Sequence, residues 1–356
     1  MTLTRTDRTP TTHVTVRARS YSLRLHRRSL LVGSASLLGL AALVVFALTS
    51  GDTGLGLPRT VQTLLGNGTT AEEFIVHTIR LPRLTAALAV GAALGCAGAI
   101  FQSLTRNPLG SPDLLGITSG AGTGAMICIV YGIAFSPMAI TLAAGIGALA
   151  VGTLIYALMG KGDPSGYRLV LIGLGTAALL TGVNGYLLTK STDITVASRA
   201  VFWLTGDLSG RDWDQSAIVA AAAVVGILAA MALSRPLDGL RYGPGVATGL
   251  GIGVRRTTTL ALALAALLTA AGVAVAGPLA FVALSAPHIA RTLCRGDKPN
   301  VWIASMYGAA IVVAADMFAQ HAIDERQLPT GVVTGAIGGL YLIWLLIAFR
   351  KKGTQL

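Results

Sequence analysis

Histidines most often carry acid–base chemistry in proteins, and the five in this 356-residue sequence do not group with one another. They are His13, His26, His77, His288 and His321. None belongs to a set of nucleophile, base and orienting residue, and the chain has no GxxxxGK[ST] phosphate loop. We therefore expect no catalytic residues and no directly bound cofactor.

The three cysteines do not suggest a site either. Cys96, Cys128 and Cys294 are odd in number and widely spaced, so they indicate neither a disulfide framework nor a metal centre. His288 follows Pro287, and we interpret it as a packing or capping residue in preference to a ligand.

The composition is that of a polytopic membrane protein. Hydrophobic residues make up 53% of the chain, charged residues only 12%, and the mean hydropathy is +0.70. The net charge of +12 does not indicate nucleic-acid binding, because the basic residues lie between apolar runs. Their position there fits orientation of the chain in the cytoplasmic membrane.

One stretch organises the rest of the chain. The run 84–105 is uncharged and long enough as a helix to cross a hydrocarbon core, with Arg80 and Arg83 before it and Arg106 after it. Pro108 and Pro112 then prevent the helix from continuing, so the chain must turn. Glycines at 91, 95 and 98, and at 331 and 335, give two spans small-residue packing faces.

Apolar runs predict an all-α domain of about ten transmembrane helices over residues 29–349. The expected spans are 29–50, 84–105, 114–135, 137–160, 169–189, 216–234, two within 257–290, 301–318 and 329–349. Gly277-Pro278 is the expected break within 257–290, and residues 197–204 are expected to form a short helix on the outer face. The basic residues favour two cytoplasmic termini, which are a disordered tail at 1–28 and a short tail at 350–356.

Three motifs resemble the FecCD-type permeases of ABC importers for iron-siderophores and cobalamin, especially the ferric-enterobactin type. They are RLPRLTAALAVGAALGCAGAIFQSLTRNPLGSPDLLG at 80–116, GPLAFVALSAPHIAR at 277–291 and QLPTGVVTGAIGGLYLIWLL at 327–346. The resemblance implies a type II importer permease fold. It also implies several partners: two ABC ATPase subunits, an extracytoplasmic siderophore-binding protein, and a second permease subunit that is identical or related.

The resemblance also implies a docking surface for the binding protein. In the family, arginines of the RLPR motif receive acidic side chains of that protein, which assigns docking to Arg80 and Arg83. A third basic position of some relatives is Gln320 here, and the nearby Arg326 is the candidate replacement. Arginines at these positions would also simply anchor a helix at the membrane interface.

Two gates and a coupling loop follow from the same resemblance. Asn107, Pro108 and Leu109 match a cytoplasmic gate, although the segment also fits a plain tight turn. Ser191 and Thr192 are placed like an outer gate. The residues of the expected ATPase coupling loop are Arg241, Gly243, Ala247, Leu250 and Gly251. Pro244-Gly245 replaces an acidic position of the family there, and a solvated basic loop is the competing interpretation.

The resemblance predicts a permease for ferric-siderophore complexes, with enterobactin-like cargo. The same machine carrying haem or cobalamin is the alternative. An ion-coupled secondary transporter would need paired intramembrane ionisable groups, and only Asp316 lies within a span. We expect Asp316 to make a structural hydrogen bond.

Overall fold

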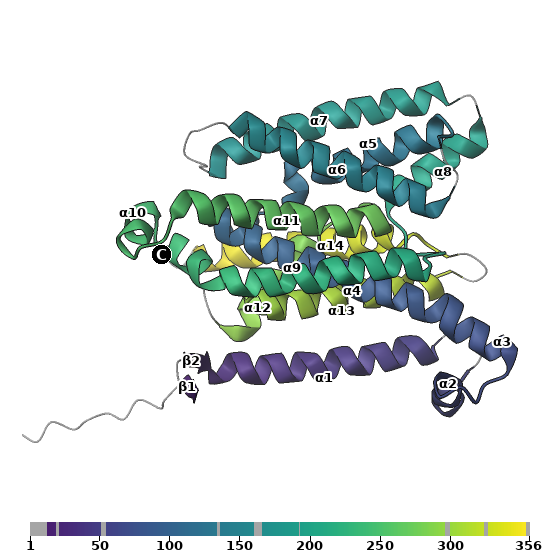
Figure 1. Cartoon of the computed structure of the whole chain (residues 1–356), viewed down its shortest axis with the longest axis horizontal. Helices are drawn as coiled ribbons and strands as arrows, with labels where there is room; N and C mark the ends of the chain where they lie inside the picture. Colours follow the sequence, from purple (N-terminus) through teal and green to yellow (C-terminus); the bar gives the residue numbers. More distant parts are fainter. Residues whose placement is uncertain are drawn as a thin grey trace, which may run out of the picture.

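The computed structural model is a bundle of long helices that lie side by side (Figure 1). It describes residues 13–353 apart from 19–20, 51–54, 134–135, 160–165, 192, 296–299 and 324–326. The helices of the bundle are α1 (Arg27–Thr49), α4 (Leu81–Thr105), α5 (Ile117–Val130), α6 (Pro137–Met159), α7 (Gly166–Lys190), α9 (Trp213–Leu240), α11 (Val254–Ala276), α12 (Val282–Cys294), α13 (Val301–His321) and α14 (Thr330–Gly353). The start of α1 and the C-terminus lie at the same end of the bundle (Figure 1). We call this the inner end, and the opposite end the outer end.

Seven helical runs among the described residues are long and apolar enough to cross a membrane. They are α1, the continuous run 70–105 that contains α4, and α6, α7, α9, α11 and α13. The short helices α5 and α12, together with α14, complete the set of about ten passes expected from the sequence. The spanning domain is therefore all-helical, as expected.

Two of the passes begin with backbone that is not α-helical. The 3-10 turn η2 (Pro112–Leu115) precedes α5, and residues 277–281 precede α12. Leu115 and Leu279 in these segments are almost fully buried, so protein shields the irregular backbone from lipid. The break predicted at Gly277-Pro278 is confirmed, because α11 ends at Ala276 and Gly277 takes a φ of 69°.

The third span begins later than expected. Leu114 lies in η2, and Gly116 takes a left-handed φ of 71° before α5 begins at Ile117. The two prolines of this connection delay helix formation, and Gly116 then redirects the chain without steric cost.

α4 lies in the middle of the bundle, where it packs against α9, α11, α12 and α13. Its small residues allow backbone contact. A Cβ added at Gly91 or Gly95 would overlap backbone atoms of α13, and a Cβ added at Gly98 would overlap the carbonyl oxygen of Ala283 in α12. The predicted packing face of α4 is confirmed. In α14, a Cβ added at Gly331 would overlap the carbonyl oxygen of Thr205, whereas a Cβ added at Gly335 would meet nothing within 4 Å among the described residues.

The N-terminal tail contains an antiparallel hairpin of β1 (His13–Ala18) and β2 (Tyr21–His26). The prediction of disorder was wrong for these residues. The sequence HVTVRA alternates β-branched valines with polar residues, which is a strand pattern that the high basic charge of the tail concealed.

Short elements occupy both ends of the bundle. At the outer end lie α2 (Leu57–Leu64), α3 (Thr70–Glu73), the π-helix η1 (Phe74–Arg80) and α8 (Ile194–Thr205), which confirms the predicted short outer helix. At the inner end, α10 (Pro244–Gly249) projects beyond the spanning helices (Figure 1).

We expect Gly98→Ala to destabilise the protein by about 1–3 kcal/mol, because the new methyl group must push α12 away from α4. Thermal unfolding of the purified variant would measure the loss. The control is Gly175→Ala, where nothing lies within 4 Å and the stability should stay unchanged or rise slightly. Equal stability of the two variants would contradict the close contact.

Candidate functional site

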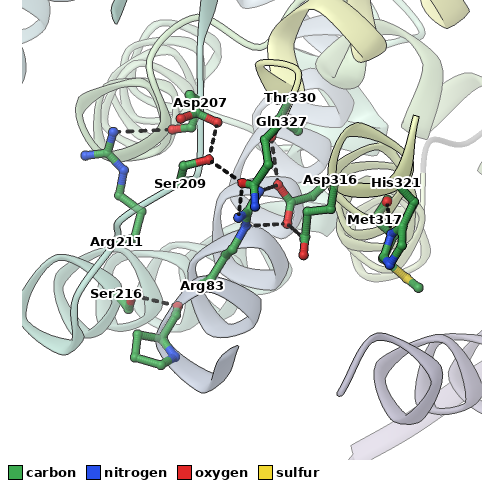
Figure 2. Close-up of polar contacts among 12 residues, drawn as sticks. Arg83, Asp207, Ser209, Arg211, Ser216, Asp316, Met317, His321, Gln327 and Thr330 are labelled. Carbon is green, nitrogen blue, oxygen red and sulfur yellow. Dashed lines mark hydrogen bonds and ion pairs between the residues drawn. The ribbon is translucent and has the colours of Figure 1, made fainter. Parts of the chain in front are cut away.

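The outer end of the bundle holds a buried ion pair between α4 and α13 (Figure 2). Arg83 donates from Nε to Asp316 Oδ2 at 2.9 Å and from Nη2 to Asp316 Oδ1 at 3.0 Å. The exposed fractions of the two side chains are only 12% and 6%. Because each of these two Arg83 nitrogens bonds a different carboxylate oxygen, the pair is bidentate, which is the stronger arrangement for an arginine and a carboxylate.

Neighbouring side chains complete the hydrogen bonding of this pair. Asp316 also accepts from Gln320 Nε2 and from Thr330 Oγ1, each at 2.8 Å. Arg83 uses its remaining Nη1 to donate to Gln327 Oε1 at 2.9 Å. Asp316 thus forms structural hydrogen bonds, as expected. Gln320, at the position where some relatives carry a basic residue, helps to hold it.

A cavity of about 190 Å³ lies beside this pair. Its lining residues come from α1, η1, α4 and α13, and include Arg80, Arg83, Asp316, Gln320 and His321. Arg80 donates from Nη1 to the carbonyl oxygen of Leu48 at 2.7 Å, which ties it to the end of α1. The structure therefore brings Arg80 and Arg83 to one outer cavity, while Arg326 lies outside the described residues.

The turn predicted as a cytoplasmic gate lies at the inner end of α4. Arg106 ends the helix with a left-handed φ of 52°, and the Asn107 side chain accepts a hydrogen bond from the backbone N–H of Leu109 at 2.9 Å. Asn107 and Pro108 are exposed and Leu109 is half-buried. The turn is compact and self-bonded, and it presents its Pro108 and Asn107 side chains to the surroundings.

Sequence reasoning missed the residue that fastens this turn. Arg291 of α12 donates from Nη2 to Gln102 Oε1 at 2.7 Å and to the carbonyl oxygen of Pro108 at 3.4 Å. Gln102 is buried in α4 and donates its own amide to the carbonyl oxygen of Leu284 at 3.2 Å. The only sequence signal was the position of Arg291 at the end of the second motif.

The predicted outer gate is only partly described. Ser191 follows α7, and its hydroxyl donates to the carbonyl oxygen of Asp193 at 3.1 Å. The Asp193 carboxylate accepts from the backbone N–H of Thr195 and so caps α8, which holds the pKa of that carboxyl below its usual range. Thr192 lies outside the described residues.

The predicted coupling loop forms a short helix between two sharp turns. Gly243 and Gly251, on either side of α10, take φ values of 98° and 78°. Ala247 is fully buried and fixes α10 to the bundle, whereas Leu250 is 64% exposed. Arg241 caps the end of α9. The loop therefore presents the apolar side chains of Val246 and Leu250 away from the bundle.

No group of three or more His, Cys, Asp or Glu side chains suited to a metal ion occurs within the described parts of the chain. His288 packs edge-on against Tyr341, with ring centroids 6.0 Å apart. This contact fits the packing role expected for His288.

Comparison with known proteins gives the class of this fold and site. A family model described as "FecCD transport family" matches residues 39–348. A solved structure of a metal-chelate type ABC transporter in an inward-facing conformation aligns with a TM-score of 0.81 at 25% identity, covering 90% of this chain and 99% of that chain. The fold is thus that of the permease subunit of an ABC transporter, a multi-pass protein of the cytoplasmic membrane.

Curated relatives agree with this class. The ferric enterobactin transport system permease protein FepG of Escherichia coli (strain K12) is 38% identical over 308 residues, which are 86% of this chain and 93% of FepG. The hemin transport system permease protein HmuU of Yersinia pestis is 34% identical over 325 residues, which are 88% of this chain and 95% of HmuU. The chain belongs to the FecCD transport family.

We expect the buried ion pair to be strongly coupled. Arg83→Gln or Asp316→Asn alone should destabilise the protein by about 3–5 kcal/mol, because each leaves a buried charge without its partner. The double variant should lose less than the sum of the two, which thermal unfolding in a double-mutant cycle would measure. Additive losses would contradict the pairing. Arg59→Gln is the control. It removes an ion pair with Glu72 whose arginine side chain is 56% exposed, and it should destabilise the protein much less.

We expect Arg291→Gln to loosen the turn at 107–109, because glutamine is too short to bond both Gln102 and Pro108. In inside-out vesicles, a Leu109→Cys variant should react several-fold faster with a membrane-impermeant maleimide when Arg291→Gln is also present. Arg295→Gln, an exposed arginine at the same helix end, should leave the rate unchanged. Equal rates in both backgrounds would show that Arg291 does not fasten the turn.

Proposed function

We propose that this chain is the permease subunit of an ATP-driven importer for ferric-siderophore complexes, with enterobactin-like cargo. The observation that carries the proposal is the 38% identity to FepG, which extends over nearly the whole of both chains. A second curated relative, the probable siderophore transport system permease protein YfhA of Bacillus subtilis (strain 168), supports the same cargo class at 35% identity over 328 residues. The cargo would pass between this chain and a second, identical or related permease subunit.

The energy would come from partner ATPases. The sequence has no phosphate loop of its own, and α10 offers a surface on which an ATPase could dock. Val246 in α10 and Leu250 directly after it are exposed, while the buried Ala247 anchors the helix. An element that is rigidly attached and apolar on its outer face is suited to transmit motion from a partner.

An extracytoplasmic siderophore-binding protein would deliver the cargo at the outer end. The cavity beside Arg80 and Arg83 is a recess in which an acidic side chain of that protein could bind, with Arg326 nearby in the sequence. Because Arg83 is already paired with Asp316, docking on Arg83 requires the incoming carboxylate to share or replace Asp316. Docking would therefore exchange one ion pair for another.

Two constrictions would close the path in turn. Asn107, Pro108 and Leu109 form the inner one, where a compact turn is held by Arg291. The outer one would include Ser191, next to the capped start of α8, and Thr192, which lies outside the described residues. A half-buried leucine at the inner turn is suited to exclude water from a narrow path.

Haem is a second candidate cargo, supported by the 34% identity to HmuU. An ion-coupled secondary transporter is less well supported. The intramembrane acid Asp316 is occupied by Arg83, Gln320 and Thr330, which leaves it poorly suited to bind and release a coupling ion.

Uptake by cells tests the cargo. Radioactive iron is presented on several siderophores, beside labelled haem and cobalamin, to cells with and without this gene and with redundant importers removed. Loss of one ferric-siderophore uptake, restored by the intact gene, is the expected result. Loss of haem or cobalamin uptake alone would change the cargo, and no change in any uptake would reject the proposal.

The same assay tests docking. The Arg80→Glu and Arg83→Glu variants that reach the membrane should fail to restore uptake, because like charges would repel the binding protein. Since Arg83→Glu also breaks the pair with Asp316, Arg80→Glu is the decisive variant, and its thermal stability should be compared with that of the intact chain. Normal uptake by Arg80→Glu would argue against docking at this cavity.

We expect Leu250→Glu to abolish co-purification of the partner ATPase, since it places a charge at the exposed apolar residue that directly follows α10. Leu250→Met, which keeps the surface apolar, should retain the ATPase. Both variants should reach the membrane in normal amounts. An ATPase that remains bound to Leu250→Glu would place the coupling surface elsewhere.

A further inference from the structure

The outer helix α2 buries its two threonines and exposes its apolar residues. Thr60 and Thr63 are almost fully buried, whereas Leu57, Val61 and Leu64 are exposed, as is Leu65 directly after the helix. This is the reverse of a helix that packs its apolar face on a soluble core. Such an arrangement requires an apolar environment outside the chain.

The buried side of α2 is held by polar contacts to the following segment. Thr63 contacts Gly68, and its backbone carbonyl lies 3.5 Å from Nε2 of His77 in η1. On the same side, Arg59 Nε forms an ion pair with Glu72 Oε1 at 2.6 Å. The backbone N–H of Thr69 and the Arg59 guanidinium hold the pKa of the Glu72 carboxyl below its usual range. α2 is therefore attached to α3 and η1 through its polar side, and its apolar side remains uncovered within the chain.

The exposed apolar residues form one narrow face. Leu57, Val61, Leu64 and Leu65 follow the spacing i, i+4, i+7 and i+8, which places them within one stripe of a helix. Leu65 is 73% exposed, the largest fraction among them. Gln62 is also exposed, but around the helix axis it lies beyond Leu65 and therefore outside this stripe. Gln62 therefore serves as a control position on the same helix for the residues of the stripe.

The surroundings of α2 favour lipid as the occupant of this face. α2 contacts α1, whose exposed Val45 and Phe46 near the outer end belong to a membrane-spanning helix with almost no buried surface. Figure 1 shows α2 nearly end-on beside the outer end of α1, whereas the spanning helices run across the picture. α2 therefore lies across the direction of the spans, at the level where α1 leaves the membrane. A short helix with one apolar stripe in this orientation has the geometry of an interfacial membrane helix.

We propose that α2 lies in the outer interface of the cytoplasmic membrane, with Leu57, Val61, Leu64 and Leu65 inserted among the lipid acyl chains. The lipid-facing surface of α1 around Val45 and Phe46 then extends to the neighbouring α2. The polar side of α2 faces η1, so the lipid contact fixes the height of the segment that leads to Arg80. This proposal does not depend on the cargo or on the energy source.

The test uses an environment-sensitive NBD label in the full chain, purified with the partner subunits that accompany it and reconstituted in lipid vesicles. The label is attached at Val61→Cys, Leu65→Cys or, as the matched control, Gln62→Cys. The native cysteines Cys96, Cys128 and Cys294 are all buried, and the unsubstituted chain reports any labelling of them. Nitroxide groups on the upper acyl chain quench from the lipid side, and iodide quenches from the aqueous side.

Labels at Val61→Cys and Leu65→Cys should emit at shorter wavelength and be quenched by the lipid nitroxide several-fold more strongly than the Gln62→Cys label. Iodide should show the opposite order. Similar iodide quenching at all three positions, with no nitroxide quenching, would overturn the proposal. Protection at Val61→Cys and Leu65→Cys that arises only when an extracytoplasmic binding protein is added would also overturn it, because the face would then be a protein-docking surface.

A charged substitution in the apolar stripe provides a second measurement. Val61→Asp should weaken nitroxide quenching at Leu65→Cys by several-fold, because the charged residue must leave the lipid. Gln62→Asp should leave this quenching unchanged. Comparable thermal stability of the two variants would exclude misfolding as the cause, and unchanged quenching in a well-folded Val61→Asp variant would count against lipid insertion.

Discussion

The whole bundle depends on how closely α4 approaches its neighbours. Within a membrane, the lipid chains are as apolar as the side chains, so burial alone does not drive helices together and packing contacts must do so. Gly91 and Gly95 meet Gly308 and the backbone around it in α13, and Gly98 meets Ala283 in α12. With no side chain between them, the helices touch along their backbones and gain contacts over their full length. This constraint explains why the most buried of the spanning runs is also rich in glycine and alanine.

The polar features of the protein are arranged around these apolar contacts. The Arg83–Asp316 pair joins the outer ends of α4 and α13, which are the same two helices that the glycines bring together. Arg291 and Gln102 join α12 and α4 near the inner end. Charged and amide side chains thus close the two ends of a contact whose middle is apolar, where they are near water and cost less to bury.

The sequence predicted the features that depend on local composition. Apolar runs located the spans, and the Gly277-Pro278 break and the short helix α8 followed from the lengths of these runs. Pairings between distant residues could not be predicted. Arg83 and Asp316 are separated by 233 positions, and nothing in either local sequence shows that one faces the other. The hairpin at the N-terminus was missed because its net charge was given more weight than its alternating pattern. The inverted polarity of α2 also requires the structure, since a sequence gives the stripe but not the side on which it lies.

One continuous helix connects the cavity proposed for docking of the binding protein to the turn proposed as the inner gate. α4 extends over 25 residues, about 37 Å, from the arginines at the outer cavity to the turn that begins at Asn107. A rigid rod of this length converts rotation into displacement, so a tilt of about 5° at the outer end moves the inner end by about 3 Å. That distance is comparable to a hydrogen bond, and the 3.4 Å contact between Arg291 and Pro108 lies at the moving end. A tilt of this size would by itself be large enough to make or break the contact between Arg291 and Pro108.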